Sequence, residues 1–252
     1  MDFLLLGLML ANTLLTAYAL HKVRKIHLAT FRLERDLAYN TAQFEPTYAQ
    51  VTAFHDLHQL IEPVKPLPPL RGWAASPDFL LEIAQYALDS KPLTILECSS
   101  GASTIVLARC CQLLGQGHVY SLEHDEVYAE KSRQELARHG LGDFASVINA
   151  PLVPTPSVDG QQWYSLEELP SSVTDVGLLV IDGPPKSTAP LARYPALPIL
   201  RDRLANECVI FLDDANRAAE QEMLRQWSEE FPEVEQAMLP LELGAARLKL
   251  VS

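Results

Sequence analysis

ILECSSGAST, residues 95–104, changes within ten positions from an apolar run to a run of small side chains. The apolar half belongs to a predicted strand over 93–97, and the small half opens a predicted helix over 102–114. A strand that passes through small residues into a helix is typical of parallel sheets, whose ligands approach the first turn of the helix. The stretch therefore predicts an α/β fold with a ligand site at the carboxyl end of this strand.

Short apolar runs continue to alternate with helical patterns toward the C-terminus. The run from Gly177 to Ile181 contains no polar side chain, which predicts a strand buried on both faces. A short turn at 242–244 joins the last two strands and predicts an antiparallel hairpin. We expect a seven-stranded, mostly parallel sheet with an antiparallel last strand and helices on both faces. The predicted strands are 93–97, 118–122, 145–149, 177–181, 207–212, 235–240 and 245–251, and the predicted helices are 77–89, 102–114, 125–139, 190–205 and 216–230.

Charge and cysteine content argue against a nucleic-acid-binding protein and against a zinc-binding protein. The 252 residues carry 20 Lys and Arg against 32 Asp and Glu, a formal net charge of −12. A chain this acidic lacks the clustered cations that non-specific nucleic-acid binding requires, so we expect no nucleic-acid partner. The four cysteines have neither paired spacing nor nearby paired histidines. They are therefore predicted to be buried, reduced thiols rather than zinc ligands.

The first twenty residues contain an apolar segment. Residues 3–20 carry no charge, and a basic cluster of His21, Lys22, Arg24 and Lys25 follows them. This order predicts an uncleaved transmembrane anchor over 1–21, with the rest of the chain on the cytoplasmic side of the membrane. Two alternatives remain at this stage. Ala17 and Ala19 fit the cleavage pattern of a secretory signal, and the segment also suits a buried helix of a soluble protein.

Residues 22–66 form a predicted connector between the anchor and the main domain at 67–252. An amphipathic helical pattern runs over 26–61, and Pro46 is expected to divide it into two helices. We expect its apolar face to pack on the main domain, with a coiled-coil stalk as the alternative. The proline-rich stretch 62–71 predicts an extended linker.

Carboxylates or small side chains follow four of the predicted strands. Glu97 ends the first strand, Glu123 with His124 follows the second, Asp182 follows the fourth, and Asp213 with Asp214 follows the fifth. Glu123 stands 26 residues after Glu97, a spacing suited to an acid that binds a ribose diol. Because parallel strands end at one edge of a sheet, these side chains are predicted to share one site.

Read together, these motifs resemble the class I S-adenosylmethionine-dependent methyltransferases. ILECSSGAST is similar to the first motif of that family and VYSLEHD to the second, while VIDGPP and VIFLDDA are similar to its motifs at the fourth and fifth strands. RGWAASPD, WY and RYPALP resemble a bacterial subgroup with a catechol O-methyltransferase-like core. The resemblance covers about residues 67–252 and implies a Rossmann-like fold. The predicted anchor, in a chain that resembles a bacterial subgroup, predicts an inner-membrane location. One position departs from the pattern, because Ser99 stands where the family has a glycine.

The resemblance also implies roles for individual residues. Alternatives remain open for five of them: Glu123 as a solvated acid, Asn149 as a turn residue, Asp214 as the cap of the following helix, and Arg193 and Tyr194 as surface residues. The implied cofactor-binding residues are Glu97, Ser99, Gly101 and Ser103 around the methionine, Glu123 on the ribose, His124, Asn149 and Ala150 near the adenine, and Asp182 at the methyl-transfer centre. Asp182, Asp213 and Asp214 match a family site for a divalent cation such as Mg²⁺, and Asp182, Arg193 and Tyr194 are the candidate catalytic residues.

The leading hypothesis is a membrane-tethered O-methyltransferase that acts on a small acceptor with S-adenosylmethionine. The alternative is a catalytically silent methyltransferase-like module that binds ligands at the membrane. The absence of GxGxxG argues against a nicotinamide oxidoreductase on a similar sheet. Trp73, Trp163 and Tyr164 are candidate lid residues, Lys186 is a candidate acceptor contact, and the segment 151–172 is a predicted specificity loop.

Overall fold

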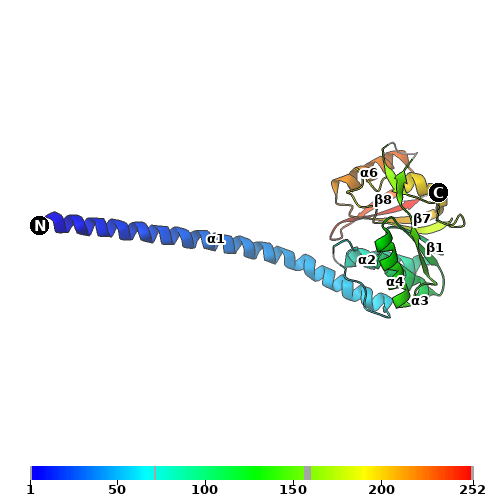
Figure 1. Cartoon of the computed structure of the whole chain (residues 1–252), viewed down its shortest axis with the longest axis horizontal. Helices are drawn as coiled ribbons and strands as arrows, with labels where there is room; N and C mark the ends of the chain where they lie inside the picture. The colour runs from blue at the N-terminus through cyan, green and yellow to red at the C-terminus, as the bar shows by residue number, and fades with distance from the viewer. Residues whose placement is uncertain (1, 71, 156–159, 251–252) are drawn as a thin grey trace. The chain divides into compact units, whose positions relative to one another are not determined.

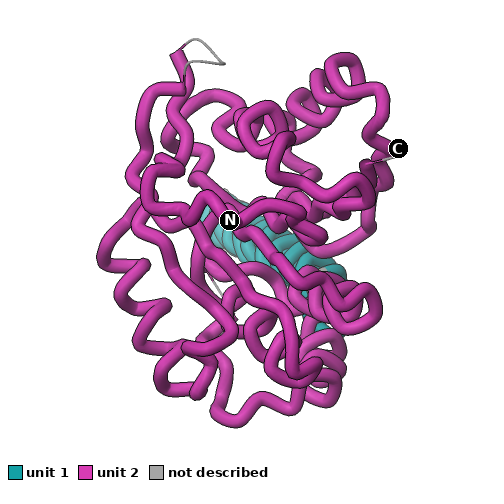
Figure 2. Tube along the Cα trace, turned by 90° about the vertical axis from the view of Figure 1, so that its right-hand side faces the viewer, with its two compact units in different colours: residues 1–49 teal, residues 50–252 magenta. Residues whose placement is uncertain are grey.

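The computed structural model describes residues 2–70, 72–155 and 160–250, and its contacts divide the chain into two compact units. The first unit comprises residues 1–49 and the second residues 50–252 (Figure 2). The second unit contains every strand of the structure. The candidate ligand site therefore belongs to the second unit alone.

Helix α1 (Asp2–Ile61) runs without interruption through Pro46. The prediction of two helices was wrong on this point. Proline removes one hydrogen-bond donor and displaces the carbonyl one turn earlier, but in an exposed helix water can donate a hydrogen bond to that carbonyl instead. The end of α1 belongs to the second unit, and there Leu57 and Ile61 are fully buried in the core. Packing of the earlier part of the connector on the main domain stays a prediction.

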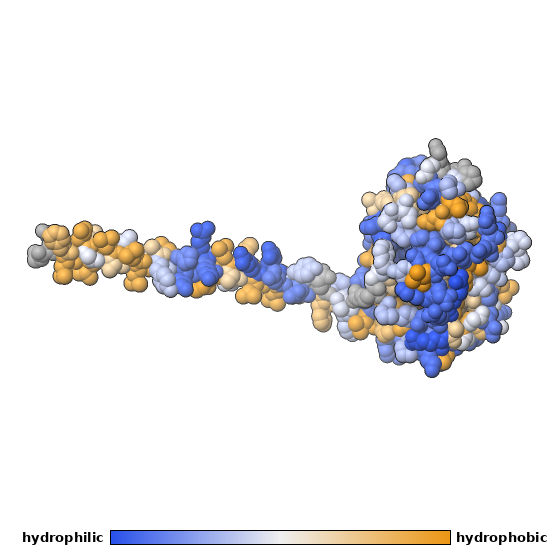
Figure 3. Space-filling view, in the orientation of Figure 1, coloured by the Kyte–Doolittle hydropathy of each residue, from blue (hydrophilic) through white to orange (hydrophobic). Residues whose placement is uncertain are grey.

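The N-terminal part of α1 is apolar and solvent-exposed. Its most apolar window of 18 residues has a mean hydropathy of 1.9, and none of that window is buried. The hydropathy view shows this segment as a nearly continuous apolar surface ahead of a hydrophilic band (Figure 3). By length and composition, α1 is the one helix in the described residues that could cross a bilayer.

Figure 1 shows the central sheet among its helices, and its strand order is β3-β2-β1-β6-β7-β9-β8. The first five strands in this order are parallel, while β9 runs antiparallel to both of its neighbours. The predicted seven-stranded sheet with an antiparallel last strand is thus confirmed. Its strands are β1 (Thr94–Cys98), β2 (His118–Glu123), β3 (Ala145–Asn149), β6 (Val176–Ile181), β7 (Leu204–Asp213), β8 (Val234–Leu239) and β9 (Ala245–Leu250). Residue 251, the end of the last predicted strand, lies outside the described residues.

Helices cover both faces of the sheet because alternate residues of each strand point to opposite sides. Ile95 lies in a core with α2 and α3, whereas its neighbour Leu96 lies in a core with α5 and α6. The helices are α2 (Pro77–Ser90), α3 (Ala102–Leu114), α4 (Glu126–His139), α5 (Ala196–Leu200) and α6 (Ala218–Glu230), with a 3₁₀ turn at Arg201–Arg203.

Two segments differ from the sequence prediction. The helix predicted over 190–205 is reduced to α5 and the 3₁₀ turn, since Pro195 lacks the N–H that an earlier helical turn would need. The predicted specificity loop contains a short antiparallel hairpin, β4 (Leu152–Pro154) with β5 (Gln162–Tyr164). Residues 156–159 between these two strands lie outside the described residues.

Candidate active site

The carboxyl ends of β1, β2, β6 and β7 border a cavity of about 370 Å³, which we call the strand-end cavity. The sheet register explains this convergence, because Cys98 pairs with Ile181 and Ile181 pairs with Leu212. The residues that follow these strands consequently lie side by side. The predicted residues that line the strand-end cavity are Ser99, Glu123, His124, Asp182, Arg193, Asp213 and Asp214.

A second cavity of about 400 Å³ adjoins the first, since both are lined by Ser99, Ser100 and Asp182. The first turn of α3 and the proline-rich segment form its walls, and Gly101 and Ser103 line it. Trp73 borders both cavities with an exposed indole. Each cavity falls within the range of about 300–1,000 Å³ that is typical of small-molecule sites.

Glu123 is almost fully buried and connects the first two strand ends. Its Oε2 accepts hydrogen bonds from the Ser100 backbone N–H at 3.1 Å and from the Ser100 hydroxyl at 2.9 Å. Its Oε1 accepts one from the Asp125 N–H at 3.1 Å and lies 3.1 Å from Nδ1 of His124. Burial acts to raise the pKa of Glu123, but these hydrogen bonds outweigh it and hold the pKa below its ordinary value. Glu123 is therefore an ionised carboxylate at the wall of the cavity.

Glu97 lies behind the loop rather than in the cavity. Its Oε2 accepts hydrogen bonds from the hydroxyls of Thr104 at 2.6 Å and Ser121 at 2.5 Å, while Oε1 is buried without a hydrogen-bond partner among the described residues. Burial raises the pKa of Glu97 above its ordinary value. An unpartnered buried carboxylate oxygen is suited to a cationic group such as the ammonium of a bound amino-acid moiety.

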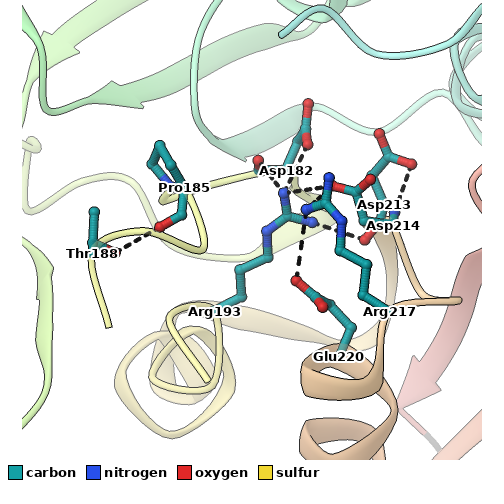
Figure 4. A network of polar contacts seen from close by, with 8 residues as sticks. All are labelled: Asp182, Pro185, Thr188, Arg193, Asp213, Asp214, Arg217 and Glu220. Carbon is teal, nitrogen blue, oxygen red and sulfur yellow. Dashed lines mark hydrogen bonds and ion pairs between the residues drawn. The ribbon is translucent and has the colours of Figure 1, made fainter. Parts of the chain in front are cut away.

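A cluster of acids and arginines, drawn in Figure 4, lines part of the strand-end cavity. Arg193 is 4% exposed, and its guanidinium lies 3.0 Å from a carboxylate oxygen of Asp182 and 3.0 Å from one of Asp214. It also donates to the backbone carbonyls of Asp182 at 2.6 Å and Asp213 at 2.8 Å. One side chain therefore ties the end of β6 to the end of β7.

Arg217 adds a second cation to this cluster. Its guanidinium lies 2.5 Å from Asp214 and 3.9 Å from Glu220, which is itself buried. Burial nevertheless raises the pKa of Asp182 to about 7, although Arg193 opposes the shift. Burial, together with the charge of Asp182, also raises the pKa of Asp213. The two guanidinium groups therefore do not fully balance the negative charge of the buried carboxylates.

Two residues at this edge have backbone angles that favour glycine. Ser99 has φ of 126° and Asp214 has φ of 60°. Such conformations cost about 1–3 kcal/mol each and persist where the surrounding structure holds them. The Ser99 N–H donates to the Leu122 carbonyl at 2.9 Å, and the Asp214 N–H donates to the Asp213 carboxylate at 2.7 Å. Asp214 does not cap α6, whose N-cap residue is Arg217.

Besides Glu97, three candidate residues lie outside both cavities. Asn149 and Ala150 sit beside the strand-end cavity, where the Ala150 N–H donates to the Glu123 carbonyl at 2.7 Å. The Tyr194 hydroxyl donates to Glu230, and its ring lies 6.4 Å from that of Trp227, a buried residue of α6. A turn at Leu191 directs Arg193 inward and Tyr194 away from the carboxylates. Lys186 lines the strand-end cavity.

Sequence reasoning missed two residues that build the site. Ser100 was quoted in the first motif without a role, yet its hydroxyl and N–H bind Glu123. Arg217 was not singled out, although it stands three residues after Asp214 at the start of a predicted helix. A cation three residues beyond an acid at a helix start was the signal available for Arg217.

Replacing Arg193 tests whether it stabilises the strand-end carboxylates. Arg193→Ala leaves Asp182 and Asp214 buried without this cation, so we expect a loss of about 3–5 kcal/mol in the free energy of unfolding. Arg217→Ala is the matched control, because its more exposed guanidinium should contribute no more than about 1 kcal/mol. Urea denaturation of both variants measures the difference. Equal losses would contradict a special role for Arg193.

The sequence profile of a family described as a methyltransferase domain matches residues 97–215. No curated protein sequence matches the chain significantly. Among solved structures, the SAH-bound methyltransferase PaMTH1 of Podospora anserina superposes with a TM-score of 0.57 at 16% identity, covering 84% of this chain and 96% of that one. An O-methyltransferase of Bacillus cereus in complex with SAH gives 0.55 at 18% identity, with 79% and 90% covered.

A third structure, the O-methyltransferase TomG of Streptomyces achromogenes with SAM, gives a TM-score of 0.52 at 16% identity, covering 81% of this chain and 90% of that one. The profile match begins at Glu97 and ends just after Asp214, so it spans all four strand ends that border the cavity. Residues 97–215 are therefore similar to a methyltransferase domain, and the chain shares the fold of these solved methyltransferases.

Proposed function

We propose that the chain transfers a methyl group from S-adenosylmethionine to an oxygen of a small-molecule acceptor. The observation that carries this proposal is the joining of Glu123, Ser99 and Asp182 in one cavity of small-molecule size. The carboxylate of Glu123 suits a ribose diol, and the loop at 99–101 leads into the N-terminal turn of α3. The solved O-methyltransferases of the same fold support oxygen as the acceptor atom.

The residues of the site have two tasks: they bind the cofactor and the acceptor, and they accept the proton that the acceptor hydroxyl loses. S-adenosylmethionine supplies an electrophilic methyl group, so the protein has to hold the acceptor in line and receive its proton. Asp182 lines both cavities and is held in place by Arg193 through one carboxylate oxygen. Its second oxygen has no hydrogen-bond partner among the described residues and is available to the acceptor hydroxyl. Asp182 therefore orients the acceptor and accepts its proton.

Substitutions at Glu123 and Asp182 should affect different quantities: the first should affect cofactor binding and the second should affect turnover. Glu123→Ala should abolish binding of S-adenosylhomocysteine, measured by calorimetric titration of the full chain in detergent. Asp182→Asn should leave that affinity within about threefold and lower turnover of an acceptor by about 10²-fold or more, because it removes a proton acceptor. Unchanged turnover in Asp182→Asn would contradict its role. A chain that binds no S-adenosylhomocysteine would instead be a catalytically silent module.

We further propose that Asp182, Asp213 and Asp214 hold a divalent cation. Their potential ligand atoms, one from each carboxylate, lie within 4.8 Å of one another. The cluster contains these three acids and Glu220 against two guanidinium groups, so its charge favours a further cation. Mg²⁺ is typically bound by a few carboxylate oxygens together with water molecules, so it suits this cluster. A bound Mg²⁺ would lower the pKa of an acceptor hydroxyl. Arg193 and Arg217 contact Asp214, and the cation has to share that carboxylate with them.

Metal binding is testable without an acceptor. Titration with Mn²⁺, followed by electron paramagnetic resonance, should show one bound ion per chain, and Asp213→Asn should weaken its binding at least tenfold. Asparagine keeps an oxygen for the Asp214 N–H, so this variant should still fold. Asp202→Asn, at an exposed position of the 3₁₀ turn, is the matched control and should bind as the wild type. Equal binding in both variants would exclude the site.

We also propose that the apolar start of α1 anchors the enzyme to a membrane, with the methyltransferase domain on the cytoplasmic side. The support is the exposed, uncharged segment 3–20 followed by Lys22, Arg24 and Lys25. The full chain should stay with membranes in high salt and leave them in detergent, whereas a chain lacking residues 1–20 should be soluble. N-terminal sequencing that begins after Ala19 would identify a cleaved signal instead.

A further inference from the structure

Tyr164, the last residue of β5, buries a hydroxyl that has no hydrogen-bond partner among the described residues. The side chain is 2% exposed, yet it belongs to the lining of the strand-end cavity. A buried hydroxyl without a partner costs about 1–3 kcal/mol, and the large majority of buried side-chain polar atoms find one. An unpaired hydroxyl at the wall of a ligand cavity is therefore a candidate ligand contact.

The hydroxyl lies directly over Gly183, at the point where the ends of β1 and β6 meet. A Cβ at residue 183 would collide with the Tyr164 hydroxyl oxygen, and it would also lie 3.1 Å from Cβ of Ser99 and 3.2 Å from the Cys98 carbonyl. Glycine at 183 thus makes room for the tyrosine. The hydroxyl consequently belongs to the same corner of the cavity as the loop that begins at Ser99.

The surroundings of the ring fix its position and its protonation state. The rings of His124 and Trp163 pack against it in edge-on geometry, at centroid distances of 6.0 Å and 5.1 Å. Burial raises the pKa of Tyr164 well above its ordinary value, and the nearby charges of Glu123 and Asp182 add to the effect. The hydroxyl therefore keeps its proton and acts as a donor. The group it meets in a ligand has to be an acceptor.

We propose that the Tyr164 hydroxyl donates a hydrogen bond to the carboxylate of the amino-acid moiety of bound S-adenosylmethionine. This inference rests on the proposed function, which places the ribose at Glu123 and the amino-acid moiety along the loop at 99–101. The sulfonium and the ammonium of the cofactor are cations and accept no hydrogen bond, so the carboxylate is the acceptor near this loop. Tyr164 is then a cofactor-binding residue contributed by the β4–β5 hairpin rather than by a strand of the main sheet.

Two ligands and one substitution test this contact in the full chain. Tyr164→Phe removes only the hydroxyl, and it should weaken binding of S-adenosylhomocysteine about tenfold or more, because the lost bond is to a charged group. Binding of 5′-methylthioadenosine, which lacks the amino-acid moiety, should stay within about twofold. The melting temperature of the ligand-free variant should not fall, since no partner of the hydroxyl is lost. Tyr86→Phe, on α2, is the matched control and should change none of the three.

Each other result overturns the assignment. Unchanged affinity for S-adenosylhomocysteine in Tyr164→Phe would show that the hydroxyl does not contact the cofactor. Equal weakening for both ligands would place the contact on the nucleoside instead of the carboxylate. A lower melting temperature without ligand would show that the hydroxyl has a structural partner. A wild-type chain that binds neither ligand would overturn the proposed function together with this inference, whereas the other results leave the proposed function standing.

Discussion

The site depends on one buried cation, Arg193, that joins the ends of β6 and β7. Asp182, Asp213 and Asp214 come together because parallel strands end at one edge, and their charges would repel one another in a buried corner. Arg193 offsets this repulsion through two carboxylates and two backbone carbonyls. The bonds to the carbonyls hold the backbone as well as the charges. The spacing between the two strand ends, and with it the shape of the cavity, is therefore set by a side chain outside the sheet.

Backbone strain is concentrated at the same edge of the sheet. Ser99 and Asp214 adopt angles that glycine favours, and each N–H is bonded to a neighbouring group that holds the residue in place. At Asp214 this conformation aims the carboxylate at Arg193 and Arg217 instead of at the first turn of α6. The local preference of aspartate for helix caps is thus overridden by charge pairing. Strain of this kind is maintained by the rigid sheet beneath it.

The sequence predicted the sheet well because buried strands are encoded by local apolar runs, such as 177–181 for β6. It also predicted the strand-end acids, since topology alone brings them to one edge. It failed where the outcome depends on contacts distant in sequence or on solvent. The length of α5, the β4–β5 hairpin and the passage of α1 through Pro46 are examples. The inward turn of Arg193 and the placement of Tyr194 on α6 likewise depend on the loop between β6 and α5.

The departure at Ser99 is best understood together with Gly183. A Cβ at residue 99 takes space beside the loop, but Gly183 on the adjacent strand end has none, and the Ser99 Cβ lies over it. The missing side chain at residue 183 therefore leaves room for the Cβ of Ser99 at this corner. The space above Gly183 is shared with the Tyr164 hydroxyl, so the ends of β1 and β6 and the β4–β5 hairpin together shape this corner. A serine in the first motif is consequently compatible with an open loop in this chain.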